Sequence, residues 1–308
     1  MKKQLICMLL SLALVLVVLS GCANKPDSPD SSNNTPTDSA DVASVVLNKE
    51  NFPRIDGSTA NIPMALLMVQ RLLGISEDEA DEMLYFSTTP NAYRALINKE
   101  TDLLLVYEAD DTVKELISQS GVALEYHPIG RDALVFLMND GNPVESLTTK
   151  QIQDIYQGNI NTWKAVGGED KEIIAYQRSQ DSGSQALIVK LVMGSLPLVQ
   201  APVERYPGEM GGLIDALASY KNSKNALGYS VYYYAKNMYS QPELKFVAVD
   251  GVAPSNESIA DGSYPFVNEF FAVVRKDEPA EGNTRKLLEW ILSEQGKQAI
   301  ADAGYVGL

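Results

Sequence analysis

The strongest constraint on the fold is the alternation of short, wholly apolar stretches with longer amphipathic ones along most of the chain. The stretches at residues 101–107 and 133–138 predict buried strands, since strands covered on both faces read as continuous apolar runs. We expect further strands or extended segments at residues 52–55, 124–128, 172–177, 227–229, 246–249 and 270–274. Between them we expect helices at residues 62–73, 77–83, 91–98, 112–119, 149–156, 185–193, 212–219 and 284–303, with an interruption of the last helix at Gly296. Strands that alternate with helices predict an α/β fold with mainly parallel sheets.

The first residues predict export from the cytoplasm. Lys2 and Lys3 are followed by the apolar residues 5–19, a run too short for a comfortable membrane span. The run ends at Leu-Ser-Gly-Cys, residues 19–22, which resembles the lipobox of bacterial lipoproteins. This resemblance implies a signal peptide at residues 1–21, acylation of the Cys22 thiol, and a location on the extracytoplasmic face of the cell membrane. The alternatives are an ordinary signal peptide or an N-terminal anchor helix.

The segment after Cys22 differs in composition from the rest of the chain. Residues 23–41 are rich in Ser, Pro, Asp, Asn and Thr and contain no large apolar residue, which predicts a disordered tether over residues 22–45. The chain has two cysteines, and Cys7 lies inside the predicted signal peptide. Loss of that peptide leaves only Cys22, so the folded part must rely on its apolar core and not on internal disulfides.

The charge balance limits the class of partner. The formal net charge is −15, which argues against nucleic acid and anionic lipid surfaces as partners. A small anion is still possible, because it responds to nearby backbone N–H groups and to a single arginine more than to the average charge.

Two segments share a design suited to a small anion. Residues 56–60 (DGSTA) and residues 178–184 (RSQDSGS) each place hydroxyl side chains and a glycine at the start of an expected helix. Unpaired N–H groups point outward at a helix N-terminus and the helix dipole favours negative charge there. Arg178 adds a planar fork that matches two oxygens of an anion. Each segment taken alone could equally be an ordinary helix cap.

Longer stretches resemble the phosphate-binding proteins of high-affinity phosphate ABC importers. The similar segments are residues 147–168 (LTTKQIQDIYQGNINTWKAVGG), the Arg-x-x-x-Ser-Gly-Ser loop at 178–184, residues 225–229 (NALGY), and the terminal residues 287–296 and 303–308. The resemblance covers roughly residues 52–308. It implies a solute-binding lipoprotein that captures hydrogen phosphate and delivers it to the permease and ATPase subunits of an importer, with no cofactor and no metal of its own.

The resemblance also implies an architecture, the type II periplasmic binding protein fold. Two α/β lobes would enclose a ligand cleft, and two strands would cross between them near residues 127–129 and 264–266. Lobe one would comprise residues 46–128 and 264–308, and lobe two residues 129–263. Hinge closure around a ligand is the expected motion.

Matching this sequence to the family residue by residue implies which residues contact the ligand. The expected ligand-binding residues are Ser58, Thr59 and Ala60 in the first loop, Thr88, Thr89 and Asn91 before a helix, and Arg178, Ser182, Gly183 and Ser184 in the last loop. Glu108 is the nearest match to the family's aspartate, which accepts the proton of hydrogen phosphate and so excludes fully ionised sulfate. Glu108 stands one residue away from the expected position, Ala60 replaces an aromatic residue and Ser184 replaces a threonine. These departures leave phosphate selectivity open.

Other classes of protein are less well supported by the residues. His127 is the one histidine, and the chain has no Gly-x-Ser-x-Gly elbow, no Ser-x-x-Lys motif and no Gly-x-x-x-x-Gly-Lys loop. We therefore expect no enzyme, and with a single mature cysteine we expect no zinc site. The alternatives that stay open are the same fold binding another oxyanion or a small organic acid, and an adhesion or signalling protein that has lost transport.

Overall fold

The computed structural model describes residues 47–180, 182–208, 210–219 and 224–308. The described residues belong to one compact unit. The predicted signal peptide, Cys22 and the tether at residues 22–45 lie outside the described residues. Within the described ranges, no helix has the length and apolar character needed to cross a membrane.

The central sheet has the strand order β1-β2-β9-β3-β6-β5, with β7 and β10 also paired to β3. Its strands are β1 (Ile55–Gly57), β2 (Leu103–Tyr107), β3 (Leu124–Asn139), β5 (Ile174–Ala175), β6 (Ala226–Val231), β7 (Leu244–Phe246), β9 (Val267–Arg275) and β10 (Val306–Gly307). A second, small sheet pairs β4 (Ser146–Leu147) with β8 (Ala248–Val249).

The expectation of mainly parallel sheets is wrong. The pairs β1–β2, β5–β6 and β4–β8 are parallel, whereas β3 and β9 pair antiparallel with each other and with every other neighbour they have in the large sheet. The reason is that β9, from near the end of the chain, inserts between β2 and β3. The sequence pattern showed alternating elements but not this late insertion.

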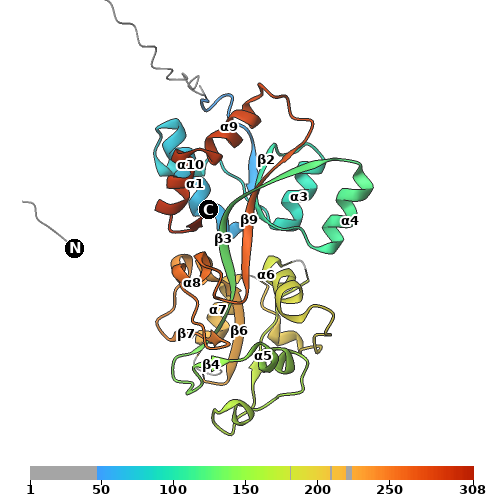
Figure 1. The fold of residues 1–308 in the computed structure, drawn as a ribbon, viewed down its shortest axis with the longest axis vertical. Coiled ribbons are helices and arrows are strands. Elements are labelled where there is room, and N and C mark those ends of the chain that lie inside the picture. Colours follow the sequence, from blue (N-terminus) through green and yellow to red (C-terminus); the bar gives the residue numbers. More distant parts are fainter. Residues whose placement is uncertain (1–46, 181, 209, 220–223) are drawn as a thin grey trace, which may run out of the picture. The chain divides into compact units, whose positions relative to one another are not determined.

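Strands β3 and β9 are long and run between two groups of helices, one at each end (Figure 1). The sequence predicted two separate strands where β3 is continuous, because Gly130 and Arg131 interrupt the apolar run. The β3–β9 pairing has an irregularity between Pro128 and Gly130, so the strand is bent there without being broken. The grouping in Figure 1 resembles the two expected lobes, whose boundaries stay a prediction.

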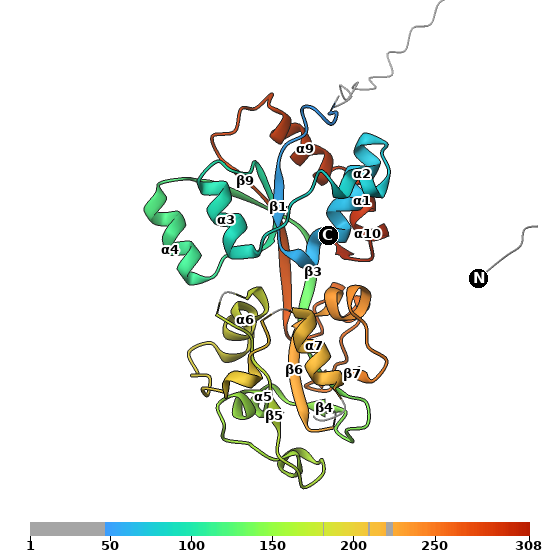
Figure 2. The same ribbon diagram turned by 180° about the vertical axis from the view of Figure 1, so that it is seen from behind.

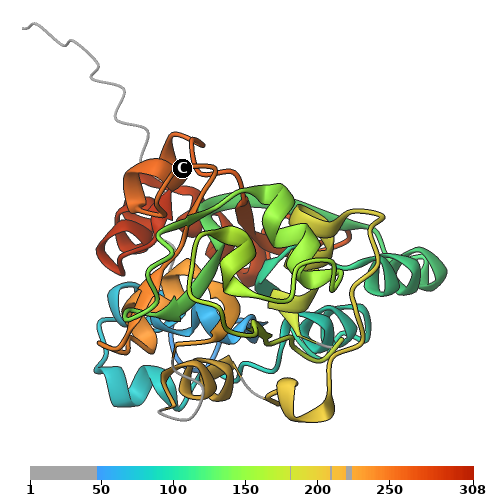
Figure 3. The same ribbon diagram turned by 90° about the horizontal axis from the view of Figure 1, so that it is seen from below.

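The helices of the upper group in Figure 1 flank the sheet on both sides, as the views from behind and from below also show (Figures 2 and 3). Helices α1, α9 and α10 lie on one side, and α3 and α4 lie on the other. The helices are α1 (Ile62–Leu73), α2 (Glu77–Asp81), α3 (Thr89–Ile97), α4 (Asp111–Ser120), α5 (Thr149–Tyr156), α6 (Gly183–Leu187), α7 (Met210–Ala218), α8 (Asn256–Ala260), α9 (Asn283–Leu292) and α10 (Glu294–Asp302). The short 3-10 helices are η1 (Thr59–Asn61), η2 (Trp163–Val166) and η4 (Val203–Arg205), and the π-helical segments are η3 (Ile188–Met193) and η5 (Tyr234–Met238).

Strand β2 shows why the apolar run at residues 101–107 folds as it does. Leu103, Leu105 and Tyr107 belong to one buried cluster, while Leu104 and Val106 belong to another on the opposite face. Side chains alternate between the two faces of a strand, and helices cover both faces here. The continuous apolar run therefore reflects burial on both sides, as predicted.

The break in the last helix falls at Ser293 and not at Gly296. Ser293 has extended backbone, and its hydroxyl oxygen accepts a hydrogen bond from the Gly296 N–H at 3.3 Å, which caps the start of α10. Gly296 lies inside α10, where a Cβ atom would collide with the carbonyl oxygens of Trp290 and Ile291. The glycine therefore permits close packing of α10 on the end of α9, a role that the sequence alone did not distinguish from a helix break.

Candidate functional site

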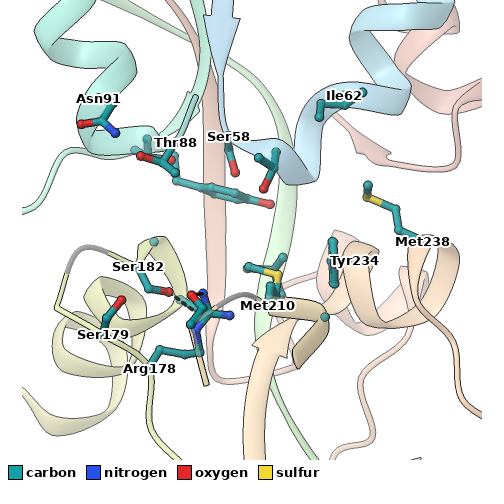
Figure 4. Close-up of a pocket in the computed structure, with 18 residues that line it drawn as sticks. Ser58, Ile62, Thr88, Asn91, Arg178, Ser179, Ser182, Met210, Tyr234 and Met238 are labelled. Atoms are coloured by element: carbon teal, nitrogen blue, oxygen red, sulfur yellow. Dashed lines mark hydrogen bonds between the residues drawn. The ribbon is translucent and has the colours of Figure 1, made fainter. Parts of the chain in front are cut away.

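A cavity of about 590 Å³ lies between the two groups of helices. Ser58, Thr88 and Asn91 approach it from one side, and Arg178, Ser179 and Ser182 approach it from the other (Figure 4). The described residues that line it are Ser58, Thr59, Ile62, Thr88, Thr89, Asn91, Tyr107, Arg178, Ser179, Ser182, Gly183, Ser184, Gly208, Met210, Gly211, Val231, Tyr234 and Met238.

The first loop leads from β1 into η1 and α1. The Ser58 N–H donates to the carbonyl oxygen of Leu105 at 3.0 Å, which holds the loop against β2. A Cβ atom on Gly57 would collide with that same carbonyl oxygen, so only glycine permits this approach. The Ser58 hydroxyl oxygen accepts from the Ala60 N–H at 3.4 Å and caps η1. Ser58 and Thr59 are thus fixed at the cavity wall by backbone contacts.

The second loop leads into α3 and is tied to the first by a buried carboxylate. Asp56 accepts hydrogen bonds from the Ser87 N–H at 2.7 Å and the Ser87 hydroxyl at 2.8 Å. Thr88 is the N-cap residue of α3, and its side chain makes no capping hydrogen bond. The Thr89 hydroxyl is buried and has no hydrogen-bond partner among the described residues, although it lines the cavity. A buried hydroxyl without a partner is costly, which favours a ligand atom at this position.

The third loop carries Arg178 and leads into α6. The Arg178 N–H contacts the Tyr229 hydroxyl at 3.0 Å and the side-chain oxygen of Gln185 at 3.1 Å, which fixes its backbone. One guanidinium nitrogen of Arg178 donates to the carbonyl oxygen of Gly208 at 3.2 Å, and the residue is 6% exposed. The hydroxyl groups of Ser182 and Ser184 lie 3.0 Å apart at the start of α6.

The two sides of the cavity come close at one point. A Cβ atom added to Gly183 would lie 3.7 Å from the Thr89 hydroxyl oxygen. The starts of α3 and α6 therefore face each other across the cavity, with Arg178 on the α6 side. Outward-pointing N–H groups, hydroxyls and one guanidinium can together surround an anion of a few oxygens.

Most of the predicted site residues meet at this cavity. Its lining includes Ser58, Thr59, Thr88, Thr89, Asn91, Arg178, Ser182, Gly183 and Ser184. Ala60 does not line it. The Ala60 side chain is fully buried, and its carbonyl oxygen accepts a hydrogen bond from the Tyr305 hydroxyl at 2.5 Å, which anchors the loop from behind.

Glu108 is also absent from the cavity lining, contrary to expectation. Its carboxylate forms an ion pair with Lys114 of α4 at 2.7 Å and another with Lys190 of η3. Burial raises the pKa of Glu108, but the hydrogen bonds from Lys114 and Lys190 together outweigh it, so the pKa lies below its ordinary value. Successive side chains along a strand point to opposite faces. Tyr107, the last residue of β2, lines the cavity, so the next side chain, Glu108, points away from it.

Sequence reasoning missed a buried pair beside the cavity, Tyr107 and Asp132. The Tyr107 hydroxyl donates to Asp132 Oδ2 at 2.7 Å, and both residues are at most 3% exposed. Burial raises the pKa of Asp132 to about 6, although hydrogen bonds from Tyr107 and from backbone N–H groups oppose the rise. The available signal was a lone carboxylate directly before the apolar run at 133–138, a residue type seldom buried without a partner.

The opposite end of the cavity is apolar. Ile62, Met210, Tyr234 and Met238 lie together at this end, away from Asn91, Thr88 and Ser182 (Figure 4). The described part of the chain contains no group of three or more His, Cys, Asp or Glu residues that could hold a metal ion.

Comparisons with known proteins agree with this geometry. The phosphate-binding protein PstS of Bacillus subtilis is 22% identical over 307 residues, which cover 99% of this chain and 95% of that protein. A substrate-binding protein of a phosphate ABC transporter from Clostridium perfringens, solved with bound phosphate, superposes with a TM-score of 0.65 at 22% identity and covers 84% of this chain and 100% of that one. A phosphate transport receptor from Vibrio cholerae gives a TM-score of 0.62 at 20% identity, covering 82% of this chain and 99% of that one.

These likenesses confirm the expected α/β fold of type II periplasmic binding proteins. A family model described as the PBP superfamily domain matches residues 37–295. The chain therefore belongs to the PBP superfamily.

Proposed function

We propose that this protein captures hydrogen phosphate outside the cytoplasm and delivers it to the permease and ATPase subunits of an ABC importer. The proposal is supported by the named relatives, which are phosphate-binding proteins. It is also supported by the family match, because substrate-binding proteins of transporters bind and deliver a solute without transforming it.

The observation that carries the proposal is the convergence of hydroxyl-bearing helix starts and Arg178 on one cavity. Ser58 and Thr59 precede α1, Thr88 and Thr89 begin α3, and the segment 182–184 begins α6. Each helix start offers N–H donors and a favourable dipole to an anion. Arg178 is the one basic side chain among the described residues of the lining.

We expect Arg178 to contribute most of the binding energy, because it is a buried, positively charged donor in the cavity lining. Hydrogen bonds to charged groups contribute about 1.5–3 kcal/mol each, and a guanidinium can offer two in parallel to phosphate oxygens. Loss of this fork would cost roughly 3 kcal/mol or more, which corresponds to roughly 100-fold weaker binding.

Isothermal titration calorimetry of protein stripped of phosphate tests the proposal. The wild type should bind phosphate, and Arg178→Met should bind it at least roughly 100-fold more weakly. Arg205→Met is the matched control, because Arg205 pairs with Glu172 in the same group of elements and does not line the cavity. Wild-type protein that fails to bind phosphate at millimolar concentration would overturn the proposal, and unchanged affinity in Arg178→Met would show that the site lies elsewhere.

The apolar end of the cavity favours a second candidate, an organic anion. Ile62, Met210, Tyr234 and Met238 could contact an apolar substituent while the hydroxyls and Arg178 hold its charged group. Titration with a phosphate monoester that carries a small alkyl group separates the candidates. Tighter binding of the ester than of inorganic phosphate would favour the organic anion.

The predicted N-terminal features complete the proposal. Acylation of Cys22 would hold the protein at the membrane, with residues 22–45 as a tether and the lobes at residues 46–128 plus 264–308 and 129–263. Metabolic labelling with a radioactive fatty acid should mark the wild type and leave Cys22→Ala unlabelled. Label on the Cys22→Ala variant would contradict the anchor.

A further inference from the structure

Strand β5 ends a few residues before Arg178, and side chains take over its hydrogen bonds there. The N–H groups of Ile174 and Tyr176 donate at 2.8 Å to backbone carbonyl oxygens at or beside the start of β6, as parallel pairing requires. The next N–H group on this side of the chain is that of Arg178. It donates to two side-chain oxygens, the Tyr229 hydroxyl at 3.0 Å and Gln185 Oε1 at 3.1 Å. The position of the Arg178 backbone therefore depends on these two side chains.

Tyr229 and Gln185 form a closed ring of hydrogen bonds with the Arg178 N–H. The Tyr229 hydroxyl accepts from Arg178 and donates its own proton to Gln185 Oε1, which accepts from Arg178 as well. Burial raises the pKa of Tyr229, so the hydroxyl keeps the proton that this ring requires. The Tyr229 side chain is itself fixed, because it is fully buried and packs edge-on against Phe136 and Tyr156.

Gln185 connects this ring to the helix start at the cavity. It lies in the first turn of α6, directly after Ser184, which lines the cavity. The other end of Arg178 is held as well, since a guanidinium nitrogen donates to the Gly208 carbonyl oxygen at 3.2 Å. A planar fork matches two oxygens of an anion only over a narrow range of positions, so a small shift of the Arg178 backbone would misalign it.

We propose that Tyr229 and Gln185 are positioning residues for Arg178, which hold its backbone where the guanidinium can meet a bound anion. This inference rests on the proposed function and adds the groups that aim its binding arginine. Neither Tyr229 nor Gln185 belongs to the cavity lining. The Tyr229 hydroxyl should therefore affect the ligand only through Arg178.

The substitution Tyr229→Phe removes one hydroxyl from the ring and keeps the aromatic packing. Isothermal titration calorimetry of the full-length protein with inorganic phosphate should show roughly 3- to 10-fold weaker binding, because the Arg178 N–H loses one of its two acceptors. In the Arg178→Met background, the same substitution should change the residual phosphate affinity, followed by phosphorus NMR, by less than roughly twofold. A general structural role of Tyr229 would instead weaken binding equally in both backgrounds.

Tyr156→Phe is the matched control. Tyr156 is fully buried beside Tyr229, and its hydroxyl has no hydrogen-bond partner among the described residues. Loss of this hydroxyl should leave phosphate affinity unchanged and should not lower the melting temperature. Gln185→Met breaks the ring from the side of α6 and should show the same dependence on Arg178 as Tyr229→Phe.

The outcomes separate this inference from the proposed function. Phosphate binding by the wild type with unchanged affinity in both Tyr229→Phe and Gln185→Met would overturn the positioning role and leave the proposed function intact. Equal losses with and without the Arg178 side chain would overturn it in the same way. Absence of phosphate binding in the wild type would overturn both. Thermal melting of each variant shows that it is folded.

Discussion

Asp132 makes the stability of the fold depend on pH in a direction opposite to that of most carboxylates. Its pKa is raised by burial from 3.8 to about 6 in the folded protein. Between these values the folded state keeps a proton that the unfolded state releases, so the free energy of unfolding falls as pH rises. The contribution of Asp132 is full below about pH 4 and is lost as pH rises through about 6.

The size of the effect follows from the shift. One pKa unit corresponds to about 1.4 kcal/mol, so a shift of about two units gives ~3 kcal/mol. Asp132→Asn carries a neutral amide of the same shape and lacks this dependence. The free energy of unfolding of the wild type minus that of Asp132→Asn should therefore fall by ~3 kcal/mol between about pH 3.5 and about pH 7.

Urea denaturation in phosphate-free buffers at several pH values measures this difference. Asp261→Asn provides a control of opposite sign, because hydrogen bonds from the Ser263 side chain and N–H lower the pKa of Asp261. A lowered pKa stabilises the folded protein above the pKa of the unfolded state, and this stabilisation is lost as pH falls. The free energy of unfolding of the wild type minus that of Asp261→Asn should therefore rise with pH. A wild-type minus Asp132→Asn difference that stays flat, or rises with pH, would refute the reasoning.

Three other substitutions test particular contacts. Gly57→Ala should destabilise the protein by roughly 1–3 kcal/mol in urea denaturation, because the added methyl group meets the Leu105 carbonyl oxygen; stability equal to the wild type would contradict the required approach. Glu108→Gln should leave phosphate affinity within roughly threefold by calorimetry, because Glu108 lies outside the cavity lining and exposed ion pairs contribute about 0–1 kcal/mol; a large loss would show that Glu108 contacts the ligand. Thr148→Ala should cost about 1 kcal/mol of unfolding free energy by removing the reciprocal cap with Gln151, and no change in melting temperature would argue against that cap.

The helices and buried strands could be predicted because their determinants are local. The apolar run at 101–107 and the N-terminal proline of α1 each indicate one element, and both elements are present in the structure. The two segments expected to bind an anion were also identified from their own residues, because hydroxyl groups and glycine before a helix are a local pattern. That the two segments would meet at one cavity was predicted only from the family resemblance.

The Tyr107–Asp132 pair could not be predicted in the same way. Its residues are 25 positions apart in the chain and come together only because β2 and β3 both pair with β9. The sequence instead drew attention to Glu108, whose charge is conspicuous next to an apolar strand. Which of two adjacent residues faces a cavity depends on the phase of strand alternation, and Tyr107 has the phase that faces inward.

The central position of β9 has a consequence for the order in which the molecule can fold. This strand, formed near the end of the chain, pairs with β2 on one side and β3 on the other, and its pairs with β3 join residues as distant as Leu124 and Arg275. Closing such long loops costs entropy before any contact repays it, so folding dominated by these pairs is slow. A chain emerging from the ribosome cannot complete the middle of its sheet until residue 275 has been made. Nearly the whole polypeptide must therefore be present before the cavity and its walls can form.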